Sequence, residues 1–409
     1  PGIYQGYDNL SNNDKLLVRL DWNISNNHSF NVRYNQVESK RPSFVSTSTS
    51  GTGFNYSQSR QSSQALHFSN SNYYQDANLY SWAAELNSKL SNKISNKLRG
   101  SYTRQNDPRS SDSDIFPFVD ILEAGTPLTS FGYEPFTYGN LRDVTSYTFN
   151  DDLSINLGKH SLTLGVQAEF STTKNGFQRF GTSLYSFASW ADFVNGAKPS
   201  NFAITYPLTA DGSQAFPSFK FAQYSAYFQD EFNVSERFKL TAGLRLENPV
   251  YPNVDEVKTH PLVAQLSFNG GQKVNTGTLP ETKLMFSPRV GFNWDINGDR
   301  SVQLRGGSGI FTGRIPFVWI VAQSGDAGML QFLQTYNGQA NTPGPFNPNP
   351  NAYIPTNKPT PGSAIPSAIS VMSPDLKFPQ TWKSSLGVDF KLPLGLIGTI
   401  EGIYNSDLN

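Results

Sequence analysis

The chain has 409 residues, of which 32 are basic and 32 acidic, so its formal net charge is zero. A neutral chain has no bulk electrostatic attraction to nucleic acid, and no nucleic-acid partner is expected. Charged residues make up 16% of the chain and aromatic residues 13%, whereas a typical soluble domain carries about 25% charged residues. The sequence contains no cysteine, which excludes disulfides, thiolate catalysis and cysteine-bound metal.

The longest apolar run is Ile315 to Ala322. A membrane-spanning helix needs roughly 18 apolar residues, so a helical membrane protein is excluded. A membrane β-barrel is still allowed, because only every second residue of a barrel strand faces lipid. The chain starts at Pro1 without a signal-peptide pattern, and we expect it to be a processed or truncated piece.

Alternation of apolar with polar residues predicts an all-β fold whose antiparallel strands follow one another along the chain. We expect about thirteen strands of ten or so residues, a length that crosses a bilayer when the strand is tilted. Their predicted ranges are 15–23, 29–37, 64–74, 78–90, 93–104, 143–157, 160–170, 224–232, 238–247, 283–296, 300–311, 380–392 and 396–405.

Very short polar turns alternate with long segments rich in Pro, Gly, Asn and Ser. Outer-membrane barrels have this asymmetry, with short periplasmic turns and long extracellular loops. The predicted loops are 38–62, 105–142, 171–220, 248–282 and 312–379. Prolines within 105–140 argue against a regular strand there, residues 183–196 have a weak helical pattern, and 341–362 is expected to be extended and partly polyproline-like.

The hairpin from Tyr224 to Glu247 shows the two-faced pattern most clearly. Its second strand places Leu240, Ala242, Leu244 and Leu246 on one face and Arg245 and Glu247 on the other. Strict alternation puts Asp230 on the apolar side, so we expect it at a wet interface or beside a bulge. Aromatic residues near the short turns are expected at the bilayer interface; they are Trp22, Phe30, Phe232, Phe238 and Trp294.

Three segments, 227–247, 286–316 and 374–405, resemble the barrel of TonB-dependent outer-membrane receptors of the Oar-like branch. The resemblance implies a 22-stranded barrel in the outer membrane, closed by an N-terminal plug and driven by the inner-membrane TonB complex. Neither a plug nor a TonB box is recognisable, so residues 1–14 are expected to be a linker and 15–409 a partial barrel. Such a partial sheet leaves two edges, and we expect it not to insert as a closed barrel by itself.

The implied activity is transport of an unidentified substrate, by import or export, through the plugged barrel. The expected partners are outer-membrane lipid, the TonB complex through the plug and the substrate, with a surface lipoprotein as a further candidate. A rival interpretation is an outer-membrane surface-binding or adhesion protein that displays its long loops.

No catalytic, cofactor or metal motif occurs, and we predict neither an enzyme nor a cofactor site. Charged residues on the polar face of the strands are candidates to face the lumen and a plug, or to pair with one another. They are Arg19, Asp21, Arg33, Arg99, Glu169, Arg245, Glu247, Arg305, Asp389 and Glu401. Aromatic residues in the loops are candidates either to stack on a ligand or to pack the loops against one another. They are Tyr133, Phe136, Tyr138, Phe187, Trp190, Phe317 and Trp319.

Overall fold

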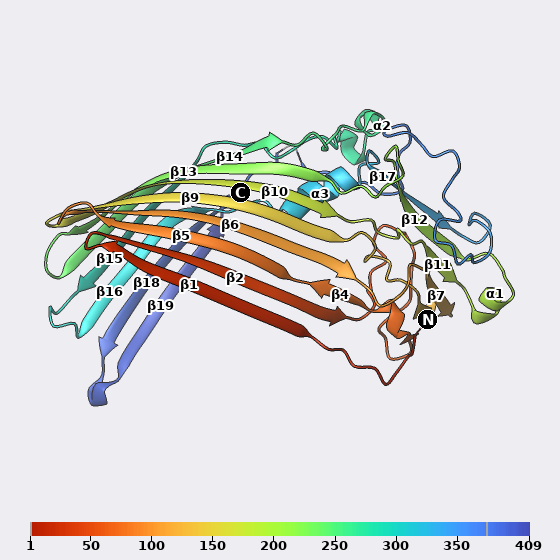
Figure 1. The fold of residues 1–409 in the computed structure, drawn as a ribbon, viewed down its shortest axis with the longest axis horizontal. Coiled ribbons are helices and arrows are strands. Elements are labelled where there is room, and N and C mark those ends of the chain that lie inside the picture. Colours follow the sequence, from red (N-terminus) through yellow and green to blue (C-terminus); the bar gives the residue numbers. More distant parts are fainter. Residues whose placement is uncertain (1, 374) are drawn as a thin grey trace.

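The computed structural model describes residues 2–373 and 375–409, and an antiparallel sheet of thirteen strands forms its body (Figure 1). The all-β prediction is confirmed. The strands of this sheet are β1 (Asn12–Ser25), β2 (His28–Ser43), β4 (Tyr73–Asp76), β5 (Asn78–Lys89), β6 (Ile94–Ser110), β9 (Leu141–Leu157), β10 (His160–Gly176), β13 (Ser218–Asn233), β14 (Phe238–Asn253), β15 (Met285–Asp295), β16 (Val302–Thr312), β18 (Gln380–Lys391) and β19 (Ile397–Asp407).

Consecutive strands are hydrogen-bonded neighbours throughout this sheet. Strands β4 and β5 are separated only by Ala77 and both pair with β2 and β6, so together they occupy one position. The sheet curls into an arch in Figure 1, with β1 and β19 at its edges. Within the described residues neither edge strand has a second neighbour.

The outward face of the sheet is apolar, because successive side chains of a strand point to opposite faces and the sequence alternates apolar with polar residues. In β1 this face carries Leu16, Val18, Leu20 and Trp22, which are 46–66% exposed. The predicted hairpin register is confirmed in β13 and β14, where Phe228 lies opposite Leu244 and Tyr227 opposite Arg245. Exposed leucines at this density are expected on a surface that meets lipid.

A row of aromatic residues marks the loop-side limit of the apolar band. Tyr34, Trp82, Tyr102, Tyr147 and Phe170 lie opposite one another on successive strands. The ring centroids of Tyr34 and Trp82 are 4.7 Å apart, and those of Tyr102 and Tyr147 are 5.2 Å apart. Amphipathic rings favour the bilayer interface, so this row forms the second aromatic belt, opposite the one predicted beside the short turns.

Two carboxylates interrupt the apolar face. Asp230 lies opposite Leu162 and Ala242 in unbroken register, so no bulge turns it away. It lies near the turn end of β13, where its Oδ2 is 2.7 Å from His160 Nδ1. Asp151 lies opposite Leu98 and Val166 and accepts a 2.6 Å hydrogen bond from Asn96 Nδ2. Each carboxylate therefore has a polar partner on the neighbouring strand.

Several predicted boundaries were wrong. The range 64–74 is not a barrel strand, because only Leu66–His67 and the start of β4 are extended there. Strand β6 continues through Pro108 to Ser110, and other barrel strands also run several residues into the predicted loops. The expected helix over 183–196 is a strand in its first part, β11 (Leu184–Phe187), and only Trp190–Val194 forms the helix α1, capped by Ser189.

The long loops build a second sheet at the loop end of the first, which we call the cap (Figure 1). Its six strands come from four separate loops and follow the order β17, β12, β11, β7, β8, β3. The bounds are β3 (Leu66–His67), β7 (Phe118–Glu123), β8 (Thr126–Phe131), β11 (Leu184–Phe187), β12 (Asn201–Pro207) and β17 (Gln331–Asn337). Strands β7, β8, β11, β12 and β17 thus lie in segments that were predicted to be loops, whereas β3 lies in the range 64–74 that was predicted to be a barrel strand.

The cap sheet is covered on both faces, which explains its regular structure. Phe118 and Leu184 pack with Val45 and Phe54 on one face, whereas the alternate residues pack on the other face in a cluster that includes Val119, Ile121, Tyr185, Phe187, Phe202 and Ile204. The proline-rich segment covers this second face through Phe346, Tyr353 and Ile354. Parallel strands need such two-sided cover, and two cap pairs, β3 with β8 and β11 with β7, are parallel.

A fully buried ion pair holds the cap together. The side chains of Arg60 and Asp120 are both 0% exposed and lie 2.8 Å apart. Tyr56 Oη and Ser130 Oγ also donate to Asp120, while Arg60 Nη1 donates to the carbonyl oxygens of Ser46 and Ser48. Every charge in this network is hydrogen-bonded, as a buried pair requires.

The remaining helices are short. They are α2 (Pro261–Gln265), α3 (Phe317–Gly325) and the 3-10 turns at Ser69–Ser71, Asn269–Gly271 and Pro393–Gly395. Of the helices in residues 2–373 and 375–409, none has the length and apolarity needed to cross a membrane. Helix α3 packs on the inner side of the sheet, where Ile320 and Val321 contact the cluster containing Phe219 and Phe221.

Replacing Asp120 by alanine is expected to destabilise the cap by about 3–5 kcal/mol, because Arg60 keeps a buried charge without a partner. Asp21→Ala is the matched control. Asp21 pairs with Arg19 on an exposed strand, and solvent-exposed ion pairs contribute little to stability. Urea-dependent proteolysis of the cap in the purified protein measures both variants, and equal small effects would contradict the assigned role of the buried pair.

Candidate functional site

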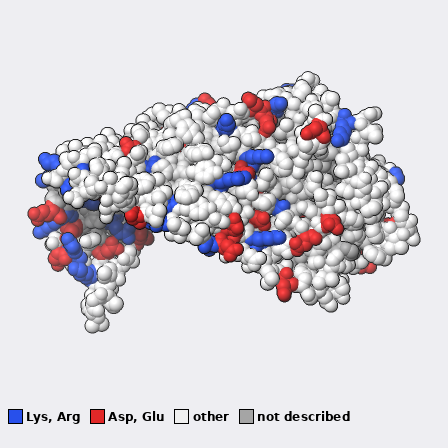
Figure 2. Space-filling model, in the orientation of Figure 1, with Lys and Arg blue, Asp and Glu red and all other residues white. Residues whose placement is uncertain are grey.

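The concave face of the main sheet carries all of the charged residues that were predicted to face a lumen. Cross-strand register places Arg19 opposite Arg33, Arg245 beside Tyr227, and Arg305 opposite Gly387 on this face. Three hollows lie along it, one near the short turns, one in the middle and one near the cap. Figure 2 shows acidic and basic side chains gathered around the hollow at the left-hand, turn end.

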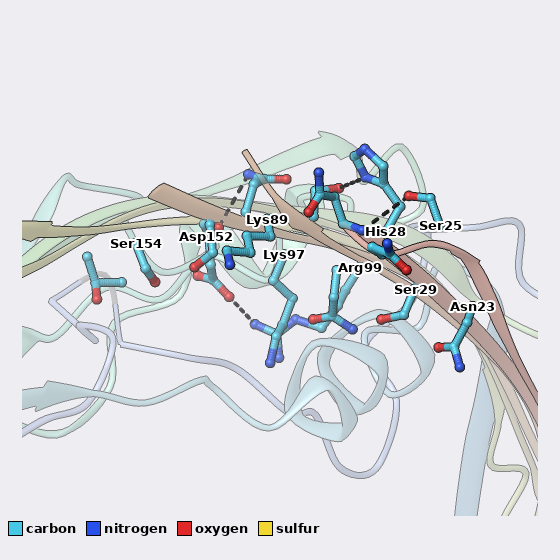
Figure 3. A pocket seen from close by; sticks show the side chains of 16 residues that line it. Asn23, Ser25, His28, Ser29, Lys89, Lys97, Arg99, Asp152 and Ser154 are labelled. Atoms are coloured by element: carbon cyan, nitrogen blue, oxygen red, sulfur yellow. Dashed lines mark hydrogen bonds and ion pairs between the residues drawn. The ribbon is translucent and has the colours of Figure 1, made fainter. Parts of the chain in front are cut away.

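The turn-end hollow has a volume of about 740 Å³ and is lined mainly by Asn and Ser side chains. Its charged members include Lys89, Lys97, Arg99 and Asp152 (Figure 3). The Arg99 guanidinium donates to Asp152 and to Asn150 on β9. This hollow is therefore a polar surface with more basic than acidic side chains.

The middle hollow has a volume of about 480 Å³. Arg19, Arg33 and Arg99 line it together with Glu85, and amide and hydroxyl side chains fill the intervening positions. Arg19 pairs with Asp21 at 2.6 Å. Glu85 accepts hydrogen bonds from Asn87 Nδ2 at 2.8 Å and Asn31 Nδ2 at 3.5 Å.

The hollow nearest the cap has a volume of about 170 Å³ and contains two ion pairs. Arg245 Nε donates to Glu247 at 3.2 Å, and its Nη2 donates to Gln167 at 2.9 Å. Arg314 binds Glu169 through both terminal nitrogens, with 2.6 Å between Nη1 and Oε1. Since Arg314 lies between β16 and α3, this contact holds the start of the α3 segment against β10.

The last predicted charges form a network at the other side of the arch. Arg305 on β16 donates to Asp389 on β18 at 2.9 Å and to Glu401 on β19 at 3.1 Å. Ion pairs thus engage every predicted charge on the concave face except Arg33, for which the described residues provide neither a hydrogen bond nor a salt bridge.

Sequence reasoning missed several members of this face, which are Glu85, Lys89, Lys97, Asp152, Tyr227 and Arg314. Asp152 was detectable, because it alternates with the outward-facing Leu153 and Ile155. Tyr227, which donates to Asp152, lies on the polar side of a hairpin whose alternation was recognised. Arg314 lies in a loop, where no periodicity indicates the direction of a side chain.

The loop aromatics divide into buried and exposed groups. Phe136 stacks on Phe177, Phe187 contacts Phe193, and Phe317 packs on Phe219 and Phe221. Tyr133 and Tyr138 contact each other edge to face at 6.3 Å. Trp190 and Trp319 are 54% and 49% exposed, so these two tryptophans remain the accessible candidates for contact with a ligand.

Glu134 is a buried carboxyl in the turn that carries Tyr133 and Phe136. Its Oε2 accepts hydrogen bonds from the Phe136 N–H at 2.9 Å and from Thr137 Oγ1 at 2.7 Å. Its Oε1 has no partner among the described residues. Burial raises the pKa of this carboxyl above its ordinary value.

Within the part of the chain that the structure describes, no group of three or more His, Asp or Glu side chains has the geometry of a metal site.

The chain belongs to the family described as the outer membrane beta barrel domain, whose pattern it matches over residues 2–403. Membership of this family confirms the barrel fold and the outer-membrane location that the resemblance to TonB-dependent receptors implies. The comparison with curated protein sequences gives no significant match.

Solved structures share this fold at low sequence identity. The outer membrane transporter YddB from Escherichia coli superimposes with a TM-score of 0.57 and 15% identity over 96% of this chain. The siderophore receptor PirA from Acinetobacter baumannii gives 0.50 and 12% over 97%, and the copper transporter OprC gives 0.50 and 11% over 97%. The chain spans 40%, 43% and 45% of the lengths of YddB, PirA and OprC.

Arg314→Ala is expected to loosen the α3 segment, because it leaves the Glu169 carboxylate, 10% exposed, without its cation. Hydrogen exchange of residues 313–325 should accelerate by at least about tenfold, which corresponds to roughly 1.4 kcal/mol of lost local stability. Arg305→Ala is the matched control, since its pairs lie on other strands. Unchanged exchange in Arg314→Ala would show that the apolar packing of α3 suffices.

Glu134→Gln is expected to change how cap stability depends on pH. The pKa of Glu134 is higher in the folded protein than in the unfolded chain, so folding favours the protonated carboxyl. The protonated carboxyl therefore gives its full stabilisation below the unfolded pKa of about 4.3, and this stabilisation is lost as pH rises through the pKa of the folded protein. The glutamine variant should lack that loss. Thermal unfolding between pH 4 and 8 measures it, with Glu123→Gln as the exposed control; parallel curves for wild type and Glu134→Gln would contradict the prediction.

Proposed function

We propose that this chain forms part of the wall of a TonB-dependent transporter, through which a polar substrate crosses the outer membrane. The observation that carries the proposal is a continuous polar track along the concave face. Arg99 lines both the turn-end and the middle hollow, and Gln167 lines both the middle hollow and the one nearest the cap. The three hollows therefore adjoin one another along the sheet.

The two ends of this track differ in a way that suits controlled passage. At the loop end, Arg314 and Glu169 tie the α3 segment to the wall beneath a cap that has its own core. At the turn end the track opens into the largest hollow. A substrate entering from outside would have to pass the cap, whereas the periplasmic side offers polar groups for a plug.

The resemblance to TonB-dependent receptors supports the remaining parts of the proposal. A plug domain would fill the arch, and the inner-membrane TonB complex would supply the energy. YddB and OprC are described as transporters and PirA as a siderophore receptor, which supports transport as the activity. Trp190, on α1 of the cap, would contact the substrate or a surface lipoprotein, and Trp319, on α3 beneath the cap, would contact the substrate.

The transport proposal is tested by comparing what cells remove from their medium. Deleting the gene should leave a compound in the spent medium that the parent strain depletes, and deleting TonB should leave the same compound, because the energy supply is then lost. Mass spectrometry of the three media measures this. A complementing copy of the unaltered gene should restore depletion in the gene-deletion strain and serves as the control.

Two outcomes contradict the proposal. Media that do not differ between parent and gene deletion, together with reduced attachment of the deletion strain to surfaces, would favour the adhesion interpretation. Depletion that requires the gene but proceeds without TonB would support passage through the barrel and refute the assigned energy source.

A further inference from the structure

We propose that the middle hollow is a binding site for an anionic group, a carboxylate or a phosphate, with Arg33 as its principal cation. The site does not depend on the transport proposal. It follows from the charges and the packing of the concave wall between β1 and β13.

Arg33 lies in an unusual electrostatic position. Its cross-strand neighbour on β1 is Arg19 and its neighbour on β5 is Ala83. Like charges placed directly opposite each other destabilise a sheet. Within the described residues Arg33 also makes no ion pair and no hydrogen bond, and the residue is exposed. The wall therefore presents a guanidinium whose charge nothing nearby neutralises directly.

The neighbouring cations are already engaged. Arg19 binds Asp21 through Nε and Nη2, with contacts of 2.6–3.0 Å. Arg99 donates to Asp152 and Asn150. Asp21 and Asp152 balance the charges of these two guanidinium groups, whereas Arg33 is left free to turn its planar donor edge towards an incoming anion.

The hollow offers space and further hydrogen-bonding groups. Ala83 is small, and the small Ser101 lies opposite it on β6, so these two side chains leave space beside Arg33. Asn31, Thr148 and Asn150 also line the hollow. A volume of about 480 Å³ accepts a small organic acid or one acidic side chain of a longer chain. Guanidinium groups bind carboxylates and phosphates through two parallel hydrogen bonds.

Glu85 is the competing partner. It lines the same hollow and lies diagonally across from Arg33, because Asn31 occupies the position directly opposite it. In the structure its carboxylate is bound by the amides of Asn31 and Asn87 instead. If Arg33 turned to pair with Glu85, the hollow would lose its free cation, and an experiment has to separate these two states.

The test uses Ser101→Cys as a reporter in the full-length protein purified in detergent, because this chain contains no cysteine of its own. Reaction rates are measured with two methanethiosulfonate reagents, one carrying a sulfonate and the other a trimethylammonium group. After each rate is divided by the rate of the same reagent with a free thiol in solution, a free cation should make the anionic reagent at least about threefold faster than the cationic one, because a unit charge about 10 Å away acts with opposite sign on the two reagents even at the dielectric constant of water. Adding Arg33→Gln should remove that preference.

Matched variants and competitors identify the source of the anion. Arg305→Gln, which removes an arginine elsewhere on the same face, should leave the preference intact. If the occupant is a free small anion, inorganic phosphate or succinate should slow labelling of the reporter. If it is an acidic side chain of a polypeptide in the arch, the reporter should resist both reagents until Arg33→Gln is introduced.

The remaining outcomes overturn the proposal. Equal rates for the two reagents, or a preference that survives Arg33→Gln, would mean that Arg33 does not set the potential of the hollow. A preference that appears only in Glu85→Gln would show that Arg33 is paired with Glu85. A reporter that stays unreactive with and without Arg33→Gln would mean that whatever covers the hollow is not held by this arginine.

Discussion

The structure depends on one constraint, which is that backbone N–H and C=O groups in a bilayer need partners within the protein. Continuous antiparallel ladders satisfy this constraint between β1 and β19, whose outer edges have no partner strand among the described residues. The same ladders fix the side-chain period at two, so one register assigns every residue to the lipid or to the concave face. The aromatic row from Tyr34 to Phe170 and the charges from Arg19 to Glu401 are two consequences of that single arrangement.

The cap follows a different rule. Its strands are short and come from distant loops, so they are stabilised by burial on both faces of a small sheet and by the pair of Arg60 with Asp120. Removing either partner of such a pair leaves an uncompensated buried charge. Here the pair joins the segment around Arg60 to β7, and the Tyr56 hydroxyl completes the shell of Asp120. The extracellular end is therefore an organised domain.

Charge on the concave face is arranged in local pairs, and this explains how a neutral chain keeps a strongly polar inner wall. Arg245 with Glu247, and Arg305 with Asp389 and Glu401, balance within a few ångströms. Such pairs leave hydrogen-bonding capacity for water or a substrate while adding no net field. Arg33 departs from this pattern, because no ion pair among the described residues engages it.

The sequence by itself determined that the fold is all-β, which face the alternating residues of a barrel strand occupy, and where the short turns lie. Alternation is a local property, and Leu240 to Leu246 carry it without help from the rest of the chain. Tertiary structure decided the cap, because residues 118–123 and 184–187 become strands only when they pair with each other across the loops. It also decided which charges meet: Arg314 reaches Glu169, 145 residues earlier, and Arg33 faces Arg19. Contacts between residues so far apart depend on the curvature and register of the whole sheet, which no local pattern encodes.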